Sequence, residues 1–502
     1  MEVGTVISSG STPSTEKFYF VLAEHALVRK GQFVVTKTEE GKLISRIADV
    51  IKVNPYFERA DSVREFERSG KSLSELFPSE RWEYLLAECV PLGVYSENSL
   101  QRSFVPPSPG EKVYLAEAQD IFNFFGLDEK GLLLGKVQHH EVEVKLNLTR
   151  LLQKHLAILA MSGAGKSYLT TVLIEELLDR KEELGKIGVV LLDVHGEYLG
   201  FAEDEHYMHN TRIIMGRDFK IGVPGLSINM FSEFIPQLTG AQKRELSRIL
   251  SMIYEEKMGK PFSLKDVLEK IEDPRIIKKA DTRNILHTFI SELESMGIFG
   301  YHDNPPLEKL SEPGKLTIID VSDLTSTKEK QIILTYIANR LFNGRRLNLV
   351  PPTLLVIEEA HNFAPEGVKR ESALSKPIIE KIAREGRKFH LALCLISQRP
   401  INLSTTALSQ CNTHIILRVT NPYDLKHIGE TSEGITSDVL KTISSLQVGE
   451  ALIVGEAVNY PLFMKVRTRK SKKAERGIPL EEAAVNFTRK KARENEDAKA
   501  FM

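Results

Sequence analysis

The sequence predicts an α/β protein with a parallel central sheet, preceded by a small β-rich module. Three observations lead to this prediction. From residue 146 onward, apolar runs alternate with helical stretches, as in a parallel sheet covered on both faces. One of these runs leads directly into a glycine-rich loop and a helix-like segment. Before residue 146, short β-type runs are separated by Gly and Pro clusters, which favours a barrel-like fold.

Size and charge set broad limits on the function. A chain of 502 residues should hold more than one domain. The 67 Lys+Arg nearly balance the 68 Asp+Glu, so any surface for nucleic acid must be local. The three cysteines are far apart, which indicates neither a disulfide framework nor a zinc site. The apolar runs are only strand-sized and no leader-like segment is evident, so we expect a cytoplasmic protein without a membrane partner.

The β-rich module is expected over residues 1–145. A Pro-rich cluster at 106–110 marks one of its turns, and residues 61–76 form a helical interruption. The β-type runs are residues 17–22, 32–37, 43–53 and 112–115.

The α/β region is expected over residues 146–464. It contains a helical insertion at about 225–300, because residues 240–296 are polar with helical spacing, and packing is its more plausible role. The expected strands are residues 156–159, 188–192, 316–321, 354–357, 391–396 and 414–417.

Residues 160–167, AMSGAGKS, form a phosphate-binding loop between a buried strand and a helix. Small residues let successive backbone N–H groups surround phosphate oxygens, and the helix N-terminus adds its positive end. We expect Lys166 to reach the β- and γ-phosphates of ATP and Ser167 to bind Mg²⁺. Ala160 stands where glycine is usual. The expected nucleotide-binding residues are Ala160, Met161, Ser162, Gly163, Ala164, Gly165, Lys166, Ser167 and Tyr168.

Two carboxylates, Glu358 and Glu359, follow the apolar strand at 354–357. Charged groups at the end of a buried strand are costly unless they have a role there. We expect Glu358 to orient the Mg²⁺ shell and Glu359 to act as the base for the attacking water. Glutamate is longer than the usual aspartate at the first position, so Glu358 could contact the metal directly or through water. The alternative is a helical first turn stabilised by acids.

A third acidic group follows the strand at 188–192. Asp193, His195 and Glu197 alternate like metal ligands, but a further zinc ligand is not evident nearby. We expect Asp193 and Glu197 to belong to the hydrolysis site, and a purely structural turn is the alternative.

Polar residues around the strand at 391–396 complete the candidate site. Gln398 follows this strand and is expected to sense the γ-phosphate or hold the attacking water through its neutral amide. Arg384 and Arg387 precede the strand, and phosphoryl transfer often uses an arginine from a neighbouring subunit. Surface salt bridging is the alternative for each arginine.

The end of the chain, residues 465–502, begins with a basic run. Such a run is usually a solvated tail. Its cations are Lys465, Arg467, Arg469, Lys470, Lys472, Lys473 and Arg476.

Several strings together resemble the archaeal HerA helicase-translocases, in the HerA/FtsK branch of phosphate-loop motors. They are KHLAILAMSGAGKS, LLDVHGEY, LLVIEEAHNF, AREGRK and LISQRP, and SQCNTHIILRVTNPYDL and LQVGEALIVGEAVNYPLFMKVR extend the likeness toward the C-terminus. The resemblance covers nearly the whole chain. It implies a RecA-like motor domain and an N-terminal barrel of the HerA–ATP-synthase type, the HAS-barrel.

The resemblance also implies a function. Members of this family form a hexameric ring that hydrolyses ATP between subunits, with Mg²⁺, and moves double-stranded DNA through its pore. The implied partner is a NurA-type nuclease in DNA end resection for recombination, which implies a nucleoid-associated protein. Arg384 and Arg387 become candidates for the arginine acting in trans, and Lys154 is a weaker candidate. The basic end resembles a segment that braces a neighbour's active site.

Two other functions stay open. A conjugation or secretion ATPase of the same motor clan would work at a membrane, although no anchor is evident in the sequence. A nucleotide-gated scaffold would bind ATP with little hydrolysis, but such a protein has no need of a base such as Glu359.

Overall fold

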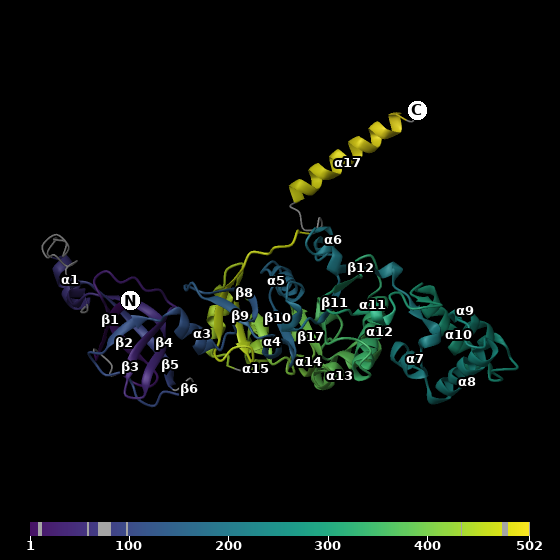
Figure 1. Ribbon diagram of the computed structural model, residues 1–502, viewed down its shortest axis with the longest axis horizontal. Coiled ribbons are helices and arrows are strands. Elements are labelled where there is room, and N and C mark those ends of the chain that lie inside the picture. The colour runs from purple at the N-terminus through teal and green to yellow at the C-terminus, as the bar shows by residue number, and fades with distance from the viewer. Residues whose placement is uncertain are drawn as a thin grey trace. The chain divides into compact units, whose positions relative to one another are not determined.

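The structure is a computed structural model that describes residues 1–8, 13–57, 60–68, 82–96, 99–432, 434–473 and 480–500. The chain divides into two compact units (Figure 1). The first comprises Met1–Asp128, Gly135–Val144 and Phe463–Lys465, and the second comprises Glu129–Leu134, Lys145–Leu462 and Val466–Met502.

The first unit is a closed β-barrel, as the sequence predicts. Its strands follow the order β2-β1-β7-β3-β4-β5, and pairing of β2 with β5 closes the barrel. The short strand β6, Ser99–Gln101, pairs with β5. Side chains such as Phe20, Val34 and Ile47 fill the barrel core. The barrel strands are β1 (Glu2–Ile7), β2 (Phe18–Leu22), β3 (Phe33–Thr38), β4 (Gly41–Val53), β5 (Tyr84–Ser96) and β7 (Lys112–Leu115).

Strand β5 was not expected, because Pro91 interrupts its apolar pattern. Proline cannot donate a ladder hydrogen bond and is tolerated in sheets mainly at bulges or edges. The pairing of β4 with β5 shifts register between Ile44 and Ser45, where Ser45 lies opposite Pro91. The irregularity therefore accommodates the proline within a long strand.

The described residues of the first unit include the α-helices α1 and α3. The expected helical interruption is present as α1, Ala60–Arg68, and residues 69–76 of that expectation lie outside the described residues. Helix α3, Ala118–Phe125, begins at a capping box and ends at Gly126, whose φ of 66° is left-handed. Its buried Phe125 packs edge-on against Phe33 of the barrel, with ring centroids 5.2 Å apart.

The motor sheet has the strand order β12-β15-β11-β16-β17-β10-β18-β19-β20-β8-β9. All the expected apolar strands are present, and every neighbouring pair from β12 through β18 in this order is parallel, which confirms the predicted parallel sheet. Strand β19 pairs antiparallel with β18. The strands are β8 (Leu132–Val137), β9 (Glu143–Leu146), β10 (Leu156–Leu159), β11 (Gly188–Asp193), β12 (Thr211–Met215), β15 (Leu316–Asp320), β16 (Thr353–Ile357), β17 (Leu391–Ser397), β18 (Thr413–Ile416), β19 (Glu450–Gly455) and β20 (Leu462–Val466).

Two long helices of this unit are buried along most of their length. Helix α5, Lys166–Leu178, buries apolar and polar residues alike, as does α12, Thr327–Arg346.

Strand β12 was not predicted as a separate strand. It forms one end of the sheet and is only partly buried, so it lacks the continuous apolar run that marks the central strands. The remaining helices are α4 (Leu148–Leu152), α6 (Gly200–Glu203), α11 (Leu307–Leu310), α13 (Lys376–Glu385), α14 (Thr405–Leu408), α15 (Pro422–Thr431) and α16 (Ser437–Ser445).

The helical insertion is present between β12 and β15. Leu246, Ile249 and Ile253 of α8 are buried, whereas Arg248 is exposed and pairs with Glu245. This pattern supports a packing role for the insertion. Its elements are β13 (Ile221–Gly222), α7 (Ile228–Phe234), α8 (Gly240–Glu256), α9 (Leu264–Glu272), α10 (Ala280–Ser295) and β14 (Phe299–Gly300).

The basic run after β20 differs from the expected solvated tail. Arg467 and Lys470 form ion pairs with acidic residues at the C-terminal end of α5. Arg476 lies outside the described residues, and α17 spans Leu480–Ala500. Across the described segments, no helix combines the length and apolarity needed to cross a membrane.

Candidate active site

The predicted site residues meet at the carboxyl edge of the motor sheet. Asp193 ends β11, Glu358 and Glu359 follow β16, Gln398 follows β17, and the phosphate loop follows β10. These four strands are neighbours in the order β11-β16-β17-β10. Ligands of parallel sheets bind beyond the carboxyl ends of the strands, so the topology brings the separate sequence motifs to one place.

The phosphate loop is held by its neighbours on both sides. The backbone N–H of Met161 donates to the Arg418 carbonyl at 2.9 Å, and that of Ala160 to the Ser397 carbonyl at 3.2 Å. Gly163 and Gly165 have left-handed φ values of 76° and 101°, which glycine adopts without strain. The Ala160 side chain is fully buried at the strand end, so alanine is accommodated at this position.

Lys166 begins α5 and lies among carboxylates. Its Nζ is 3.0 Å from Glu359 Oε1 and 3.7 Å from Glu358 Oε1. Burial works to lower the pKa of Lys166, but the two carboxylates outweigh it and the pKa is raised. The ammonium group therefore stays charged.

Glu358 is fully buried and incompletely satisfied. Its Oε2 accepts a hydrogen bond from the Val194 N–H at 3.2 Å, while Oε1 has no hydrogen-bond partner among the described residues. Burial raises the pKa of this carboxyl well above its ordinary value, and the Asp193 carboxylate raises it further. An unsatisfied buried carboxylate oxygen fits contact with a cation or with a water molecule of its shell.

Glu359 has an unusual backbone conformation. Its φ of 48° lies in the left-handed region, which costs a residue other than glycine about 1–2 kcal/mol. The Gln398 amide donates to Glu359 Oε1 at 2.9 Å, whereas Oε2 has no hydrogen-bond partner in the described part of the chain. Such strain concentrates at functional sites, where it fixes the direction of a side chain.

A cavity of about 580 Å³ opens in front of these groups, which is a usual size for a small-ligand site. The described segments contain no group of three or more His, Cys, Asp or Glu side chains that could hold a metal ion. The site suits Mg²⁺, which usually takes one or two protein ligands together with substrate phosphates. The cavity is lined by Ser162, Lys166, Ser167, Tyr168, Thr171, His195, Glu197, Glu359, Gln398, Arg469 and Lys473.

Asp193 lies beside the site but does not line this cavity. Its Oδ1 accepts from the N–H groups of His195 and Gly196 at 3.1 and 2.7 Å and from a third N–H, that of Glu197, at 3.3 Å. Its Oδ2 accepts from the Tyr198 N–H at 3.0 Å. The carboxylate therefore fixes the turn after β11, and the geometry favours a positioning role over the expected direct part in hydrolysis.

We expect Asp193→Asn to reduce stability first. The substitution removes a charged acceptor and places an NH₂ group near backbone N–H donors. The free energy of unfolding should therefore fall by about 1–3 kcal/mol. The measurement is the urea midpoint of the motor unfolding transition, with the exposed Asp218→Asn as control. Unchanged stability combined with lost turnover would instead place Asp193 in the chemistry.

Comparisons with known proteins show where this site belongs. The profile "Helicase HerA, central domain" matches residues 132–341. A probable helicase of Methanocaldococcus jannaschii is 31% identical, over 93% of this chain and 95% of the relative. The chain belongs to the HerA helicase family. The DNA double-strand break repair helicase HerA of Pyrococcus furiosus is 29% identical, over 95% of this chain and 94% of its own.

Solved structures agree with the HerA assignment at the level of fold. VirB4 of Thermoanaerobacter pseudethanolicus has a TM-score of 0.50 and 17% identity, covering 68% of this chain and 97% of its own. The bacterial conjugative coupling protein TrwB has a TM-score of 0.50 and 12% identity, covering 72% and 94%. The chain therefore has the fold of a phosphate-loop motor ATPase, as predicted.

The candidates for a residue acting in trans lie away from their own phosphate loop. Arg384 and Arg387 precede β17 and Lys154 precedes β10, so all three are at the amino edge of the sheet. The buried His155 ring connects the two segments by a 2.9 Å contact with the Ala383 carbonyl. Arg384 and Arg387 are exposed, and Arg384 lies at the ion-pair limit of 4.0 Å from Glu380, whereas Lys154 pairs closely with Glu456 at 2.8 Å. None of the three lines the 580 Å³ cavity of this HerA-family chain.

Thr171, Arg469 and Lys473 line the cavity but were not predicted there. The two cations were assigned to the basic end, either as a solvated tail or as a brace for a neighbour's active site. A signal for them was present in α5. Glu175 and Glu176 interrupt an otherwise apolar run, and buried acids require cationic or hydrogen-bonding partners. Those partners come from the segment after β20.

Proposed function

We propose that this HerA-family protein is an ATP-driven translocase and helicase on double-stranded DNA. It works as a homo-hexameric ring with a NurA-type nuclease, in the DNA end resection that prepares recombinational repair at the nucleoid. The observation that carries the proposal is the division of the site between two edges. Lys166, Glu359 and Gln398 meet at one edge, and the exposed Arg384 and Arg387 lie at the other.

The carboxyl edge supplies phosphate binding and a base. In the proposed site the N–H groups of residues 162–167 surround the phosphates of ATP. Lys166 exchanges its contact with Glu359 Oε1, now 3.0 Å, for the terminal phosphates. Glu359 is thereby released to accept a proton from the attacking water, while the Gln398 amide, which now donates to Glu359 at 2.9 Å, is placed to orient that water.

Magnesium binding falls to Ser167, with Glu358 contacting the ion or its water shell. The unsatisfied Glu358 Oε1 is the observation that supports this assignment. When bound, Mg²⁺ neutralises charge that develops on the phosphate oxygens. Asp193 keeps the turn after β11 in place through four backbone N–H groups, so that Val194 can hold Glu358 Oε2.

The amino edge is the proposed source of an arginine that acts in trans. The cavity contains Lys166, Arg469 and Lys473 of the same chain, but neither Arg384 nor Arg387. Head-to-tail contacts between copies place one subunit's amino edge against the next subunit's phosphate loop, and such contacts close into rings. An arginine supplied in this way stabilises charge on the transferred phosphoryl group. A ring also concentrates few cations around DNA despite the nearly balanced charge of the chain.

The alternative is a conjugation or secretion motor. It draws on the likeness to VirB4 and TrwB, which concerns the fold alone. Full-length relatives named as DNA double-strand break repair helicases favour the repair translocase. ATP hydrolysis that responded to membranes and a protein substrate, and not to DNA, would favour the alternative.

Duplex DNA is expected to stimulate ATP hydrolysis by the purified protein. In the presence of ATP and DNA, native mass measurement should give a particle of six times the 56.6 kDa chain mass. The stimulation should weaken as salt rises, because phosphate contacts release counterions. Lys166→Ala, which removes the lysine of the phosphate loop, serves as the control that cannot hydrolyse ATP. A monomeric particle would contradict the shared site, and an ATPase indifferent to DNA, with or without a nuclease partner, would contradict the translocase.

A further inference from the structure

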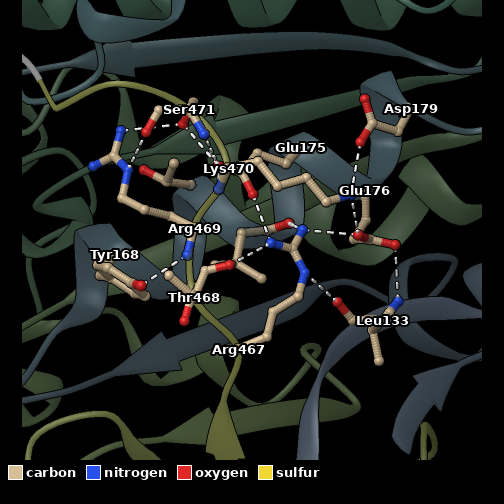
Figure 2. Close-up of polar contacts among 12 residues, drawn as sticks. Leu133, Tyr168, Glu175, Glu176, Asp179, Arg467, Thr468, Arg469, Lys470 and Ser471 are labelled. Atoms are coloured by element: carbon tan, nitrogen blue, oxygen red, sulfur yellow. Dashed lines mark hydrogen bonds and ion pairs between the residues drawn. The ribbon is translucent and has the colours of Figure 1, made fainter.

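Residues 467–473, here named the C-terminal strap, lie along the helix that begins at the phosphate loop. The strap leaves β20 and contacts α5 from Tyr168 in its first turn to Asp179 at its C-cap. Figure 2 shows strap side chains directed at the acidic residues of this helix. The strap is therefore attached to the element that positions Lys166 and Ser167.

Glu175 anchors the centre of the strap. Its side chain is fully buried, and its Oε1 accepts from the Lys470 N–H, the Ser471 N–H and the Ser471 hydroxyl at 2.8, 2.8 and 2.7 Å. Its Oε2 accepts from Arg467 Nη1 at 2.8 Å. A buried carboxylate is tolerated only when it is paired and hydrogen-bonded, and here the strap supplies these bonds.

Arg467 secures the start of the strap in a similar way. Its side chain is 13% exposed, and Nη2 donates to Glu176 Oε1 at 2.7 Å while Nε donates to the Leu133 carbonyl at 3.0 Å. Lys470 then pairs with Glu176 and Asp179 at 3.1 and 2.8 Å (Figure 2). These charge-assisted bonds fix the position of the residues between and beyond them.

Two further strap cations line the nucleotide cavity. The Arg469 backbone N–H donates to the Tyr168 hydroxyl at 2.7 Å. Because Tyr168 directly follows Ser167, this bond holds Arg469 close to the phosphate loop. Its Nε and Nη2 bond to oxygens of Ser471 and Lys472, whereas Nη1 makes no hydrogen bond to the described residues. Within those same residues, neither Arg469 nor Lys473 has an ion-pair partner, although both line the cavity.

The charges of Arg469 and Lys473 indicate the class of ligand that they bind. Lys166 is already paired with Glu359, so the cavity contains two further cations on its strap side. Burial lowers the pKa of the Arg469 guanidinium, yet an arginine remains charged at neutral pH. Unpaired cations beside a phosphate loop fit an extended polyanion, since arginine binds phosphate oxygens through its planar set of donors.

We propose that Arg469 and Lys473 bind the phosphate chain of the nucleotide held by the phosphate loop of the same chain. The inference rests on the proposed function, because it requires that the cavity hold a nucleotide. The anchored strap supplies these contacts before and after hydrolysis. They therefore strengthen ADP and ATP binding alike, raising affinity without a matching gain in kcat.

The test compares four variants of the full-length protein. Arg469→Gln, Lys473→Gln and Arg469→Lys probe the proposed contacts, and Lys472→Gln removes the same charge from a strap residue that does not line the cavity. Calorimetry gives Kd for ADP with Mg²⁺ and for inorganic tripolyphosphate. Steady-state ATP hydrolysis gives kcat and KM. Thermal unfolding without nucleotide reports any purely structural effect.

Arg469→Gln is expected to weaken both probes about tenfold, as for the loss of one hydrogen bond to a charged group. The exposed Lys473 should contribute less, about threefold. Arg469→Lys should recover part of the affinity because it keeps the charge, and Lys472→Gln should match the wild type. In both Gln variants of the cavity residues, KM should rise while kcat stays nearly constant.

Three results would overturn the proposal, each in a distinguishable way. Wild-type affinity in both Arg469→Gln and Lys473→Gln would remove the strap from the site and leave the proposed function intact. Weaker ADP binding with unchanged tripolyphosphate binding would assign the contact to ribose or base. Weaker binding that follows a lower unfolding temperature, without recovery in Arg469→Lys, would mean a structural role only. Failure of the wild type to bind either probe would contradict the proposed function itself.

Discussion

Glu359→Gln is expected to reduce ATP hydrolysis by about 10²–10⁴-fold while ATP binding is retained. The amide keeps the shape of the side chain and a hydrogen-bonding partner for Gln398, but it cannot accept the proton of water. It also removes the negative charge 3.0 Å from Lys166 Nζ, so Lys166 is freer to bind phosphate and affinity should equal or exceed that of the wild type. Single-turnover hydrolysis and equilibrium ATP binding, measured on the same preparation, check both parts.

The control for Glu359→Gln is Glu371→Gln, the same change at an exposed position after the same strand. It should leave turnover unchanged. Near-normal hydrolysis in Glu359→Gln would exclude Glu359 as the base. If an ATP-dependent DNA activity then survived the loss of hydrolysis, the nucleotide-gated scaffold would become the better interpretation.

At least one of Arg384→Ala and Arg387→Ala is expected to reduce kcat by about 10³-fold or more, which is the usual contribution of an arginine acting in trans. Because neither residue lines the cavity of its own chain, Kd for ATP should be nearly unchanged in both variants. Both side chains are exposed, so chain stability should change little. The measurements are kcat, nucleotide Kd and native mass, since the effect requires an assembled ring.

The exposed Lys388→Ala is the matched control, because it removes a neighbouring cation from the same amino edge. Lys154→Ala should have the smaller effect, since Glu456 neutralises that ammonium group in the same chain. Wild-type kcat in both arginine variants would show that they only form surface contacts. If either substitution weakened ATP binding more than it lowered kcat, the assignment of that arginine to a neighbour's reaction would be contradicted.

The sequence was most informative about the carboxyl edge of the sheet. The residues of the phosphate loop have physical roles that follow from their types and spacing. The strand preceding Glu358 and Glu359 is apolar enough to be identified from its own sequence. Once the sheet is parallel, Gln398 must lie near this pair, and its amide is 2.9 Å from Glu359. Strand periodicity therefore predicted contacts between residues far apart in the chain.

Other features depend on tertiary contacts that periodicity does not encode. Asp193 could equally serve chemistry or a turn, and the choice depends on four backbone N–H groups that only the folded loop brings together. The left-handed φ of Glu359 has no sequence signature, because glycine is the residue expected there. The basic run resembled a solvated tail since its acidic partners lie on a distant helix.

That distance has a consequence for how the protein is made. Arg467 and Glu175 are separated by 292 positions, so α5 leaves the ribosome roughly 15–60 s before its partner at 5–20 residues per second. During this interval the phosphate-loop helix carries acids without their native cations. The nascent motor therefore has its loop residues early but gains a fully compensated nucleotide helix only after the strap has been translated. Synthesis of the strap thus acts as a checkpoint on the formation of an ATP site.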